Sequence, residues 1–282
     1  MRLSFAGSRG HAWLRAFAPR GWRDLLLQVA LLGSFQLVYA LTGIYGREKT
    51  EAAVSNGRGI LRLEQTLGIA WEHPIQTWVL QAPHIFVQVA NQTYFLCQFT
   101  VSTIFLIWVY VRHTERFDWL RNALLAANYV SVAVLFLFPA APPRLLPGAG
   151  FVDTLNADTV NLNTNLISTL NNPYSTMPSL HAAYAIAIGI TGATIARSWW
   201  AKTLWSLYPC LVIYSVIATG NHFFLDVAAG AAALLGTPLI GGAVALAASL
   251  RARYGLALSW QLAALTTLAI ALFSIGEATR IT

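Results

Sequence analysis

The chain has 282 residues, of which 56% are hydrophobic and only 10% are charged. A soluble protein of this size carries about 25% charged residues. The composition therefore excludes an ordinary water-soluble protein and indicates that most of the surface faces lipid. The net charge of +7 comes without a dense basic run interleaved with aromatic residues, so we expect no nucleic-acid partner.

The chain begins with a basic segment, 1–24, and an apolar run from 25 to about 44 follows it. This run is longer than the apolar core of a signal peptide, so we interpret it as a retained membrane span. The next segment, 46–83, mixes charges with apolar residues at helical spacing. This spacing predicts an interfacial amphipathic helix. The apolar positions are Ile60, Leu63, Leu67 and Trp71.

Six further apolar runs are long enough to be candidate spans. They cover 85–111, 120–138, 180–196, 204–219, 223–250 and 256–275. We expect an all-α fold, a polytopic membrane helical bundle, with a catalytic membrane domain at 25–250 and an additional C-terminal span within 251–282. Between two spans, residues 139–177 are rich in Pro, Asn and Thr. They predict a long loop, and such loops are often functional.

The distribution of Lys and Arg sets the expected topology. With the N-terminus in the cytoplasm, twelve basic residues lie inside and six lie outside, as the positive-inside rule favours. This orientation places 46–83, 139–177 and the turn at 219–222 together on the extracytoplasmic side. We therefore expect a multi-pass protein of the cell membrane with its active site on the outer face.

The first motif with chemical meaning is Met177-Pro178-Ser179-Leu180-His181, where the long loop enters a span. Pro favours a first helical turn and Ser is a good capping residue. A helix N-terminus presents free N–H groups and the positive end of the helix dipole, which together bind anions. We predict that Ser179 and the backbone N–H of Leu180 bind a phosphate and that His181 delivers a proton to it. Taken alone, His181 would be a satisfied polar residue of a helix bundle.

The second motif is Asn221-His222-Phe223-Phe224-Leu225-Asp226, where an outer turn enters a span. His222 and Asp226 are four residues apart and share a helix face. A carboxylate beside an imidazole fixes its tautomer and stabilises the imidazolium, which leaves the other ring nitrogen to attack an electrophile. The alternative for Asp226 is a helix-end carboxylate satisfied by water. Carboxylates in membrane segments are rare and need a partner, which favours the pair.

Basic residues near these motifs supply candidate phosphate ligands. Arg144 is the only basic residue of the loop at 139–177, and a guanidinium binds phosphate oxygens bidentately. The alternative is an arginine that snorkels to the interface. Arg58, Arg62 and Glu64 of the amphipathic segment are further candidates to line the site, or else form the polar face of an interfacial helix.

These three pieces, in this order, resemble the motifs of the type 2 phosphatidic acid phosphatase (PAP2) superfamily. That family has a basic residue and Arg-Pro in its first motif, P-S-G-H in the second, and S-R followed by H-x-x-x-D in the third. The resemblance implies a bundle of six core spans, to which a seventh is added here. It implies His181, His222 and Asp226 as catalytic residues. The implied phosphate ligands are Arg144, Ser179, Leu180 and Asn221.

The chain departs from the family pattern in its cations. The first motif reads Pro143-Arg144 with no basic residue a few positions upstream, and Leu180 replaces a glycine. Ser215 and Val216 stand where the third motif has Ser-Arg, so an arginine is missing. This reduced pattern is more similar to the inositol phosphotransferase branch, which includes inositol phosphorylceramide synthases, than to the phosphatidate phosphatases. Glu64 also resembles a feature of that branch.

The sequence therefore predicts an enzyme that acts on a membrane lipid phosphate or phosphodiester through a phosphohistidine on His222. Arg144, Ser179 and the helix N-termini would hold the phosphate oxygens, and water or an alcohol would accept the group. The enzyme is then a phosphatase or a phosphotransferase, the latter moving a headgroup such as inositol phosphate. We expect no cofactor and no metal, because no acidic cluster suits Mg²⁺.

Two readings of other classes stay open. One is a non-catalytic lipid-binding or scaffold protein with a degraded phosphate site, which the missing cations favour and the intact His181, His222 and Asp226 oppose. The other is a proton-coupled transporter. A transporter predicts charges near the middle of the spans, whereas the charges here cluster at one face.

Overall fold

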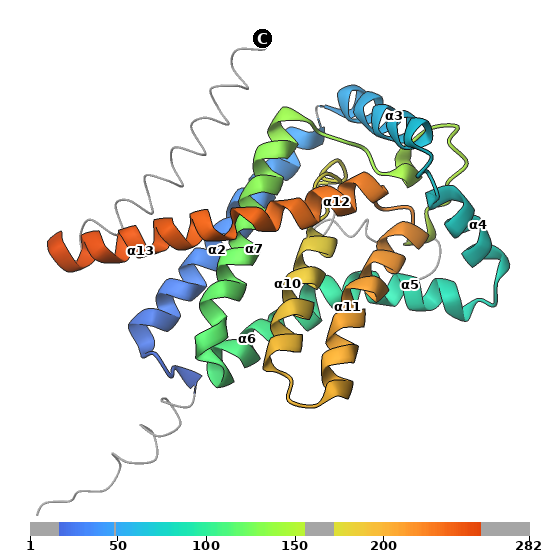
Figure 1. Ribbon diagram of the computed structural model, residues 1–282. Coiled ribbons are helices and arrows are strands. Elements are labelled where there is room, and N and C mark those ends of the chain that lie inside the picture. The colour runs from blue at the N-terminus through green and yellow to red at the C-terminus, as the bar shows by residue number, and fades with distance from the viewer. Residues whose placement is uncertain (1–16, 48, 156–171, 255–282) are drawn as a thin grey trace, which may run out of the picture.

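The computed structural model describes residues 17–47, 49–155 and 172–254, and these residues contain helices but no named strand (Figure 1). An isolated bridge pairs Ala140 with Ser175. The all-α fold class expected from the sequence is confirmed. The predicted span at 256–275 lies outside the described residues, as do most of segment 1–24 and the loop residues 156–171.

The long helices follow the apolar runs of the sequence. Four runs correspond to single helices: α2 (Trp22–Arg47), α7 (Thr114–Leu137), α10 (Leu180–Ile195) and α11 (Trp199–Ala218). The run at 85–111 becomes α5 (Ile85–Phe95), the π-helix η1 (Leu96–Val101) and α6 (Ser102–Arg112). The run at 223–250 becomes α12 (Phe224–Ala233), the 3₁₀ turn η3 (Leu234–Gly236) and α13 (Thr237–Tyr254).

Within the described part of the chain, four helical stretches are long and apolar enough to cross a membrane. They are Ile85–Arg112, Thr114–Leu137, Trp199–Ala218 and Phe224–Ser249, and α10 is a shorter apolar helix. The predicted number of six core spans and a seventh stays a prediction.

The segment at 46–83 forms two helices instead of one. α3 (Thr50–Leu67) ends at Gly68, which has a φ of 72°. Glycine adopts this left-handed conformation readily and so ends the helix, and α4 (Glu72–Gln81) follows. Ile60 is buried in an apolar cluster with residues of the loop after α7 and with Phe223. The other apolar residues of the predicted stripe are exposed and free to face lipid: Leu63, Leu67 and Trp71.

α7 is the central helix of the bundle (Figure 1), and α2, α6, α10, α12 and α13 all pack against it. The most extensive helix–helix packing is between α10 and α11. A Cβ atom added to Gly192 would lie 2.4 Å from the ring of Trp205, and one added to Gly189 would lie 2.8 Å from Pro209. Small residues therefore let these two helices approach each other, as is common in membrane bundles.

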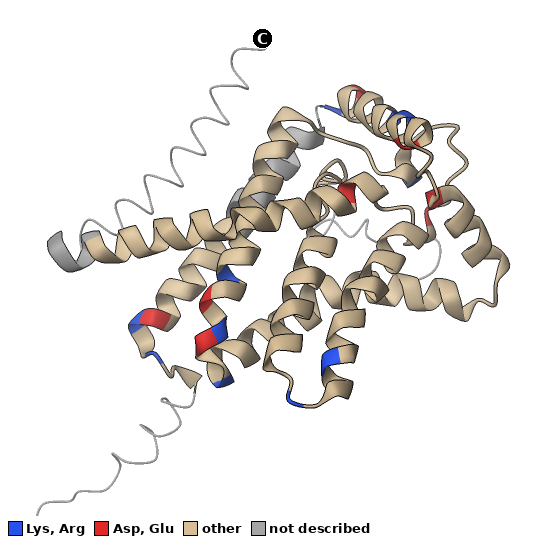
Figure 2. Ribbon diagram, viewed as in Figure 1, with Lys and Arg blue, Asp and Glu red and all other residues tan. Residues whose placement is uncertain are grey.

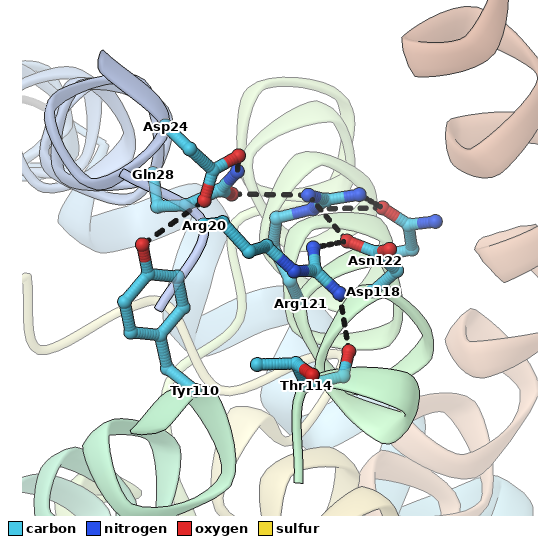
Figure 3. Close-up of polar contacts among 8 residues, drawn as sticks. All are labelled: Arg20, Asp24, Gln28, Tyr110, Thr114, Asp118, Arg121 and Asn122. Atoms are coloured by element: carbon cyan, nitrogen blue, oxygen red, sulfur yellow. Dashed lines mark hydrogen bonds and ion pairs between the residues drawn. The ribbon is translucent and has the colours of Figure 1, made fainter. Parts of the chain in front are cut away.

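A polar cluster fastens α2 to α7 (Figure 3). Arg121 is buried, and its guanidinium donates to Gln28 at 3.0 Å and to Asn122 at 2.9 Å. It also pairs with Asp118 at 3.0 Å, and Arg20 pairs with the same carboxylate at 2.7 Å. A buried guanidinium is tolerated when paired and hydrogen bonded in this way. The cluster therefore holds α2 in place on α7.

Among the residues that the structure describes, the charged side chains gather at two ends of the bundle, and a band without charges separates these ends (Figure 2). One end carries α3, the start of α4 and the start of α12. The opposite end carries the starts of α2 and α7, including the polar cluster of Figure 3. Polar groups at both ends and apolar helices between them are the pattern of a protein that crosses a bilayer.

Candidate active site

His222 lies in the turn between α11 and α12, and the last carbonyl groups of α11 fix this turn. The N–H groups of Asn221 and His222 both donate to the carbonyl of Val216, at 3.0 and 3.2 Å. Gly220 has a φ of 65°, which a glycine beyond a helix C-terminus adopts without strain. His222 is buried as a result.

Asp226 faces the His222 ring from the first turn of α12. Nδ1 of His222 lies 3.4 Å from Oδ2 of Asp226, and this carboxylate is fully buried. The same oxygen accepts a hydrogen bond from the N–H of Phe223 at 2.9 Å. The predicted pairing is therefore present in the structure, although His222 lies in the turn before α12 and not on a helix face with Asp226. With Nδ1 toward the carboxylate, Nε2 is the ring nitrogen on the opposite side.

Ser179 joins the start of α10 to the start of α12. Its N–H donates to the backbone carbonyl of Asp226 at 2.9 Å, and its Oγ accepts from the N–H of Ala182 at 3.3 Å. The predicted helix cap is thus confirmed. Leu180 is the first residue of α10, and helix geometry leaves its N–H without an intrahelical acceptor.

Gly230 permits this junction, because a Cβ at that position would lie 2.3 Å from the carbonyl oxygen of Ser179. The start of α10, which carries His181, and α12, which follows the His222 turn, therefore meet in direct backbone contact.

His181 lies against His222, with their ring centroids 5.7 Å apart in a T-shaped arrangement. Its other face stacks on Tyr94, with centroids 4.2 Å apart, and its ring is hydrogen bonded to the backbone of Tyr94. Nε2 of His181 is buried and has no hydrogen-bond partner among the described residues. No sequence motif marks Tyr94, which directly precedes Phe95 and the π-helix η1. π-helical turns are frequent at functional sites, but their position is not visible in the sequence.

Arg144 lies in the 3₁₀ turn η2 (Pro143–Leu145), and its N–H donates to the carbonyl of Gly220 at 2.9 Å. This bond places it beside the turn that carries His222. Nε donates to Oδ1 of Asn221 at 2.8 Å, and Nη1 pairs with Oδ2 of Asp153 at 2.8 Å. The cation predicted for phosphate binding is thus at the site, where it also pairs with Asp153, a carboxylate that no sequence motif indicates. Asn221, also predicted to bind phosphate, holds Arg144 in this structure.

Two buried glutamates occupy the start of α12. The N–H of Leu225 donates to Oε1 of Glu64 at 2.7 Å, and the N–H of Phe224 donates to Oε1 of Glu72 at 2.9 Å. This finding corrects the expectation that the N-termini of both helices hold phosphate. The first N–H groups of α12 already have carboxylate acceptors, so the N-terminus of α10 is the one left for an anion.

Residues 58–240 match the family model of the PAP2 superfamily. The chain belongs to the PAP2 superfamily. The match covers more than half of the chain and includes His181, His222, Asp226 and Arg144. The family resemblance inferred from the motifs is confirmed, and the apolar helices agree with a multi-pass PAP2 membrane protein.

One curated relative is the phosphoinositol dihydroceramide synthase of Bacteroides thetaiotaomicron. The two chains are 29% identical over 160 residues, which make up 51% of this chain and 52% of the relative. The chain therefore matches about half the length of this relative. No solved structure matches the chain.

The structure shows what replaces the missing arginine of the third PAP2 motif. Val216, at that position, is fully buried in an apolar cluster, and the neighbouring Ser215 donates to the carbonyl of Ala90 at 2.7 Å. These side chains pack in the protein core and offer no cation to a phosphate. The position of the missing arginine is therefore occupied by an apolar side chain of the protein core.

Arg58 and Arg62 belong to α3. They line a hollow of about 400 Å³ whose lining residues do not include His181 or His222. Arg58 also donates to the carbonyl of Pro147 at 3.2 Å. Their role at the site of this PAP2 member stays a prediction. The remaining lining residues of the hollow are Thr50, Glu51, Val54 and Ser55.

Proposed function

We propose that this member of the PAP2 superfamily is a membrane lipid phosphotransferase or phosphatase that forms a phosphohistidine on His222. The observation that carries the proposal is the meeting of His222, the buried Asp226 and His181 where the starts of α10 and α12 touch. An imidazole paired with a carboxylate and in contact with a second imidazole is an arrangement for nucleophilic and acid–base catalysis.

In the first half-reaction, Nε2 of His222 attacks phosphorus of the lipid phosphate or phosphodiester. An N–P bond forms while the P–O bond to the leaving group breaks. Nε2 of His181 gives its proton to the leaving oxygen. Asp226 stabilises the positive charge on the His222 ring. Arg144, with Ser179 and the N–H of Leu180, stabilises the negative charge on the remaining phosphate oxygens.

In the second half-reaction, water or an alcohol attacks the phosphohistidine, and the N–P bond breaks. Nε2 of His181, now unprotonated, accepts the proton of the attacking hydroxyl. The name of the relative supports an alcohol acceptor and an inositol phosphate type of headgroup. The reduced set of cations supports the same branch of the family. We therefore favour a phosphotransferase over a phosphatase.

The proposed site is extracytoplasmic. The end of the bundle that carries α3, α4 and the start of α12 is the end to which the Lys and Arg distribution assigns the outer face. A lipid headgroup lies at the depth of these helix ends, where the two histidines meet.

The test is an assay of the purified protein in lipid or detergent with phosphatidate, a polyprenyl diphosphate and phosphatidylinositol as donors. Each donor is offered with and without an alcohol acceptor such as ceramide or inositol. His222→Ala should abolish turnover, while His113→Ala, a histidine at the opposite end of the bundle, should retain it. Acid-labile, base-stable phosphate on the wild-type chain would identify the phosphohistidine.

The outcomes of this assay distinguish between the possible functions of the site. Product formed only with an alcohol acceptor supports a phosphotransferase, and phosphate released without one supports a phosphatase. Turnover by His222→Ala at the wild-type rate would contradict the covalent mechanism. Binding of a lipid phosphate without turnover of any donor would favour the non-catalytic lipid-binding protein.

A further inference from the structure

Two glutamates from different helices meet at the start of α12. Glu64 comes from α3 and Glu72 opens α4, and both are fully buried. Each uses Oε1 to accept the N–H of one residue in the first turn of α12, Leu225 for Glu64 and Phe224 for Glu72. Helix geometry leaves these N–H groups without partners inside the helix. The glutamates therefore cap α12 from outside.

The second oxygen of each glutamate shows how the pair is charged. Oε2 of Glu64 and Oε2 of Glu72 are buried, and neither accepts a hydrogen bond from a donor among the described residues. Their Oε1 atoms accept the N–H groups of consecutive residues, Leu225 and Phe224, which brings the two carboxyl groups side by side. Two ionised carboxylates cannot form a hydrogen bond with each other, because both are acceptors. A carboxyl and a carboxylate can share one proton in a hydrogen bond. Burial, followed by this contact with Glu72, raises the pKa of Glu64 to about 9.

The charged groups around the pair favour one retained proton. The carboxylates that act on Glu64 are Glu72 from α4 and Asp226 from α12, and both oppose a further negative charge. The arginines of α3, Arg58 and Arg62, are exposed. No group of three acidic, His or Cys side chains in the described ranges is arranged to hold a metal ion. The positive end of the α12 dipole favours the single negative charge that remains.

We propose that Glu64 and Glu72 share one proton and act as positioning residues that fix the start of α12, and with it Asp226 and His222. This inference rests on the proposed function for its catalytic meaning. The pair holds the N–H groups of Phe224 and Leu225, which lie between the two catalytic residues in the chain. Loss of the shared proton would place two carboxylates against each other and displace this turn.

The first experiment compares variants of Glu64 by activity. Glu64→Gln keeps an acceptor oxygen for Leu225 and offers an N–H to Glu72 in place of the shared proton. We expect it to retain kcat within about threefold and to keep that activity above pH 9, where the wild type declines. Glu64→Ala should lower kcat at least about tenfold with KM changed less than about twofold. Gln65→Ala, an exposed neighbour on α3, is the matched control.

The second experiment uses no substrate. Between about pH 4.5 and about pH 9, folded Glu64 binds a proton that unfolded Glu64 has released. The free energy of unfolding of the wild type therefore falls as the pH rises through this window. Glu64→Gln does not titrate, so its melting temperature should rise relative to the wild type from pH 5 to pH 9. Hydrogen exchange at Phe224 and Leu225 should be slow in both and faster in Glu64→Ala.

Each result decides the proposal. A melting-temperature difference that does not change with pH would overturn the shared proton. Unchanged kcat and unchanged exchange in Glu64→Ala would overturn the positioning role, and so would a Glu64→Gln variant as impaired as Glu64→Ala. If no donor is turned over, the proposed function fails. The melting and exchange measurements then still decide whether the glutamates share a proton and cap α12.

Discussion

At the scale of single residues, Asp226 decides how the His222 ring is used. Its carboxylate is fully buried, lies 3.4 Å from Nδ1 of His222 and also accepts the N–H of Phe223. A buried carboxylate is unfavourable unless it interacts with a partner. The imidazole and the capping N–H are its partners here, so the same atom serves the fold and the proposed chemistry.

Replacing Asp226 with Asn should separate these two roles. The Asn oxygen can still accept the N–H of Phe223, but the negative charge that stabilises the His222 imidazolium is lost. We expect the protein to fold and kcat to fall on the order of 10³- to 10⁴-fold, the size of effect seen when a buried aspartate behind a catalytic histidine becomes an amide.

The measurement is steady-state turnover of the donor found active in the panel, together with the yield of phosphohistidine. Glu115→Gln, an exposed carboxylate at the opposite end of the bundle, is the control and should keep wild-type activity. An Asp226→Asn variant with normal kcat would show that the carboxylate is only a helix cap.

The sequence predicted the residues of the site that lie in local patterns. His222 and Asp226 lie four residues apart on either side of the start of α12, and Ser179 and His181 stand at the start of α10, so spacing alone relates them. Tyr94, Asp153 and Glu72 reach the site from segments far away in the chain. No local pattern marks them, because their roles depend on how α4, α5 and the loop after Leu145 pack.

At the scale of elements, the contact between α10 and α12 brings the two histidines together. The bond from the N–H of Ser179 to the carbonyl of Asp226 fixes this contact, and Gly230 leaves room for it. An isolated glycine in an apolar helix has several explanations from sequence alone. The close approach of the Ser179 carbonyl explains this one.

Replacing Gly230 with Ala should therefore disturb the site from a distance. The new Cβ would lie 2.3 Å from the Ser179 carbonyl oxygen, so α12 must move away from α10. Overpacking of this kind destabilises a protein by about 1–3 kcal/mol. We expect a lower melting temperature in detergent and a lower kcat, because Asp226 and His222 move with α12.

Gly242→Ala is the matched control for this change. Gly242 belongs to the helical segment that continues from α12, and no atom lies within 4 Å of an added Cβ there. This variant should melt at the wild-type temperature or above it, since Ala favours a helix over Gly. Equal behaviour of the two alanine variants would show that the contact at Ser179 tolerates movement.

The elements themselves were predictable to different degrees. Apolar runs of spanning length predicted α2, α7, α10 and α11, because a helix in lipid must be apolar along its whole length. The break between α3 and α4 at Gly68 was missed, since an isolated glycine in a helical pattern does not by itself end a helix. The π-helical turn after Phe95 was also missed, because no residue pattern in Leu96–Val101 marks such a turn.

At the scale of the whole molecule, the two charged ends serve different purposes. The end with Arg20, Asp118 and Arg121 pairs its charges and fastens α2 to α7 (Figure 3). The opposite end carries His181, His222 and the buried carboxylates. The sequence predicted which residues share an end, because charge is excluded from the apolar band between them. Which end faces the cytoplasm rests on the count of Lys and Arg alone.

This orientation can be tested by labelling one cysteine at each end. In a Cys210→Ser background, where Cys97 is buried, Gln65→Cys places a thiol on exposed α3 and Arg116→Cys places one on the exposed start of α7. A membrane-impermeant maleimide added to sealed right-side-out vesicles should label position 65 and not position 116. Detergent should then expose position 116 to the reagent.

Inside-out vesicles supply the control, because there the two positions should exchange their reactivity. The physical reason is the positive-inside rule, with twelve basic residues assigned to the cytoplasmic side and six to the outer side. Labelling of position 116 alone in right-side-out vesicles would reverse the topology. The two histidines would then meet lipid headgroups of the cytoplasmic leaflet, and donor and acceptor lipids would have to come from that leaflet.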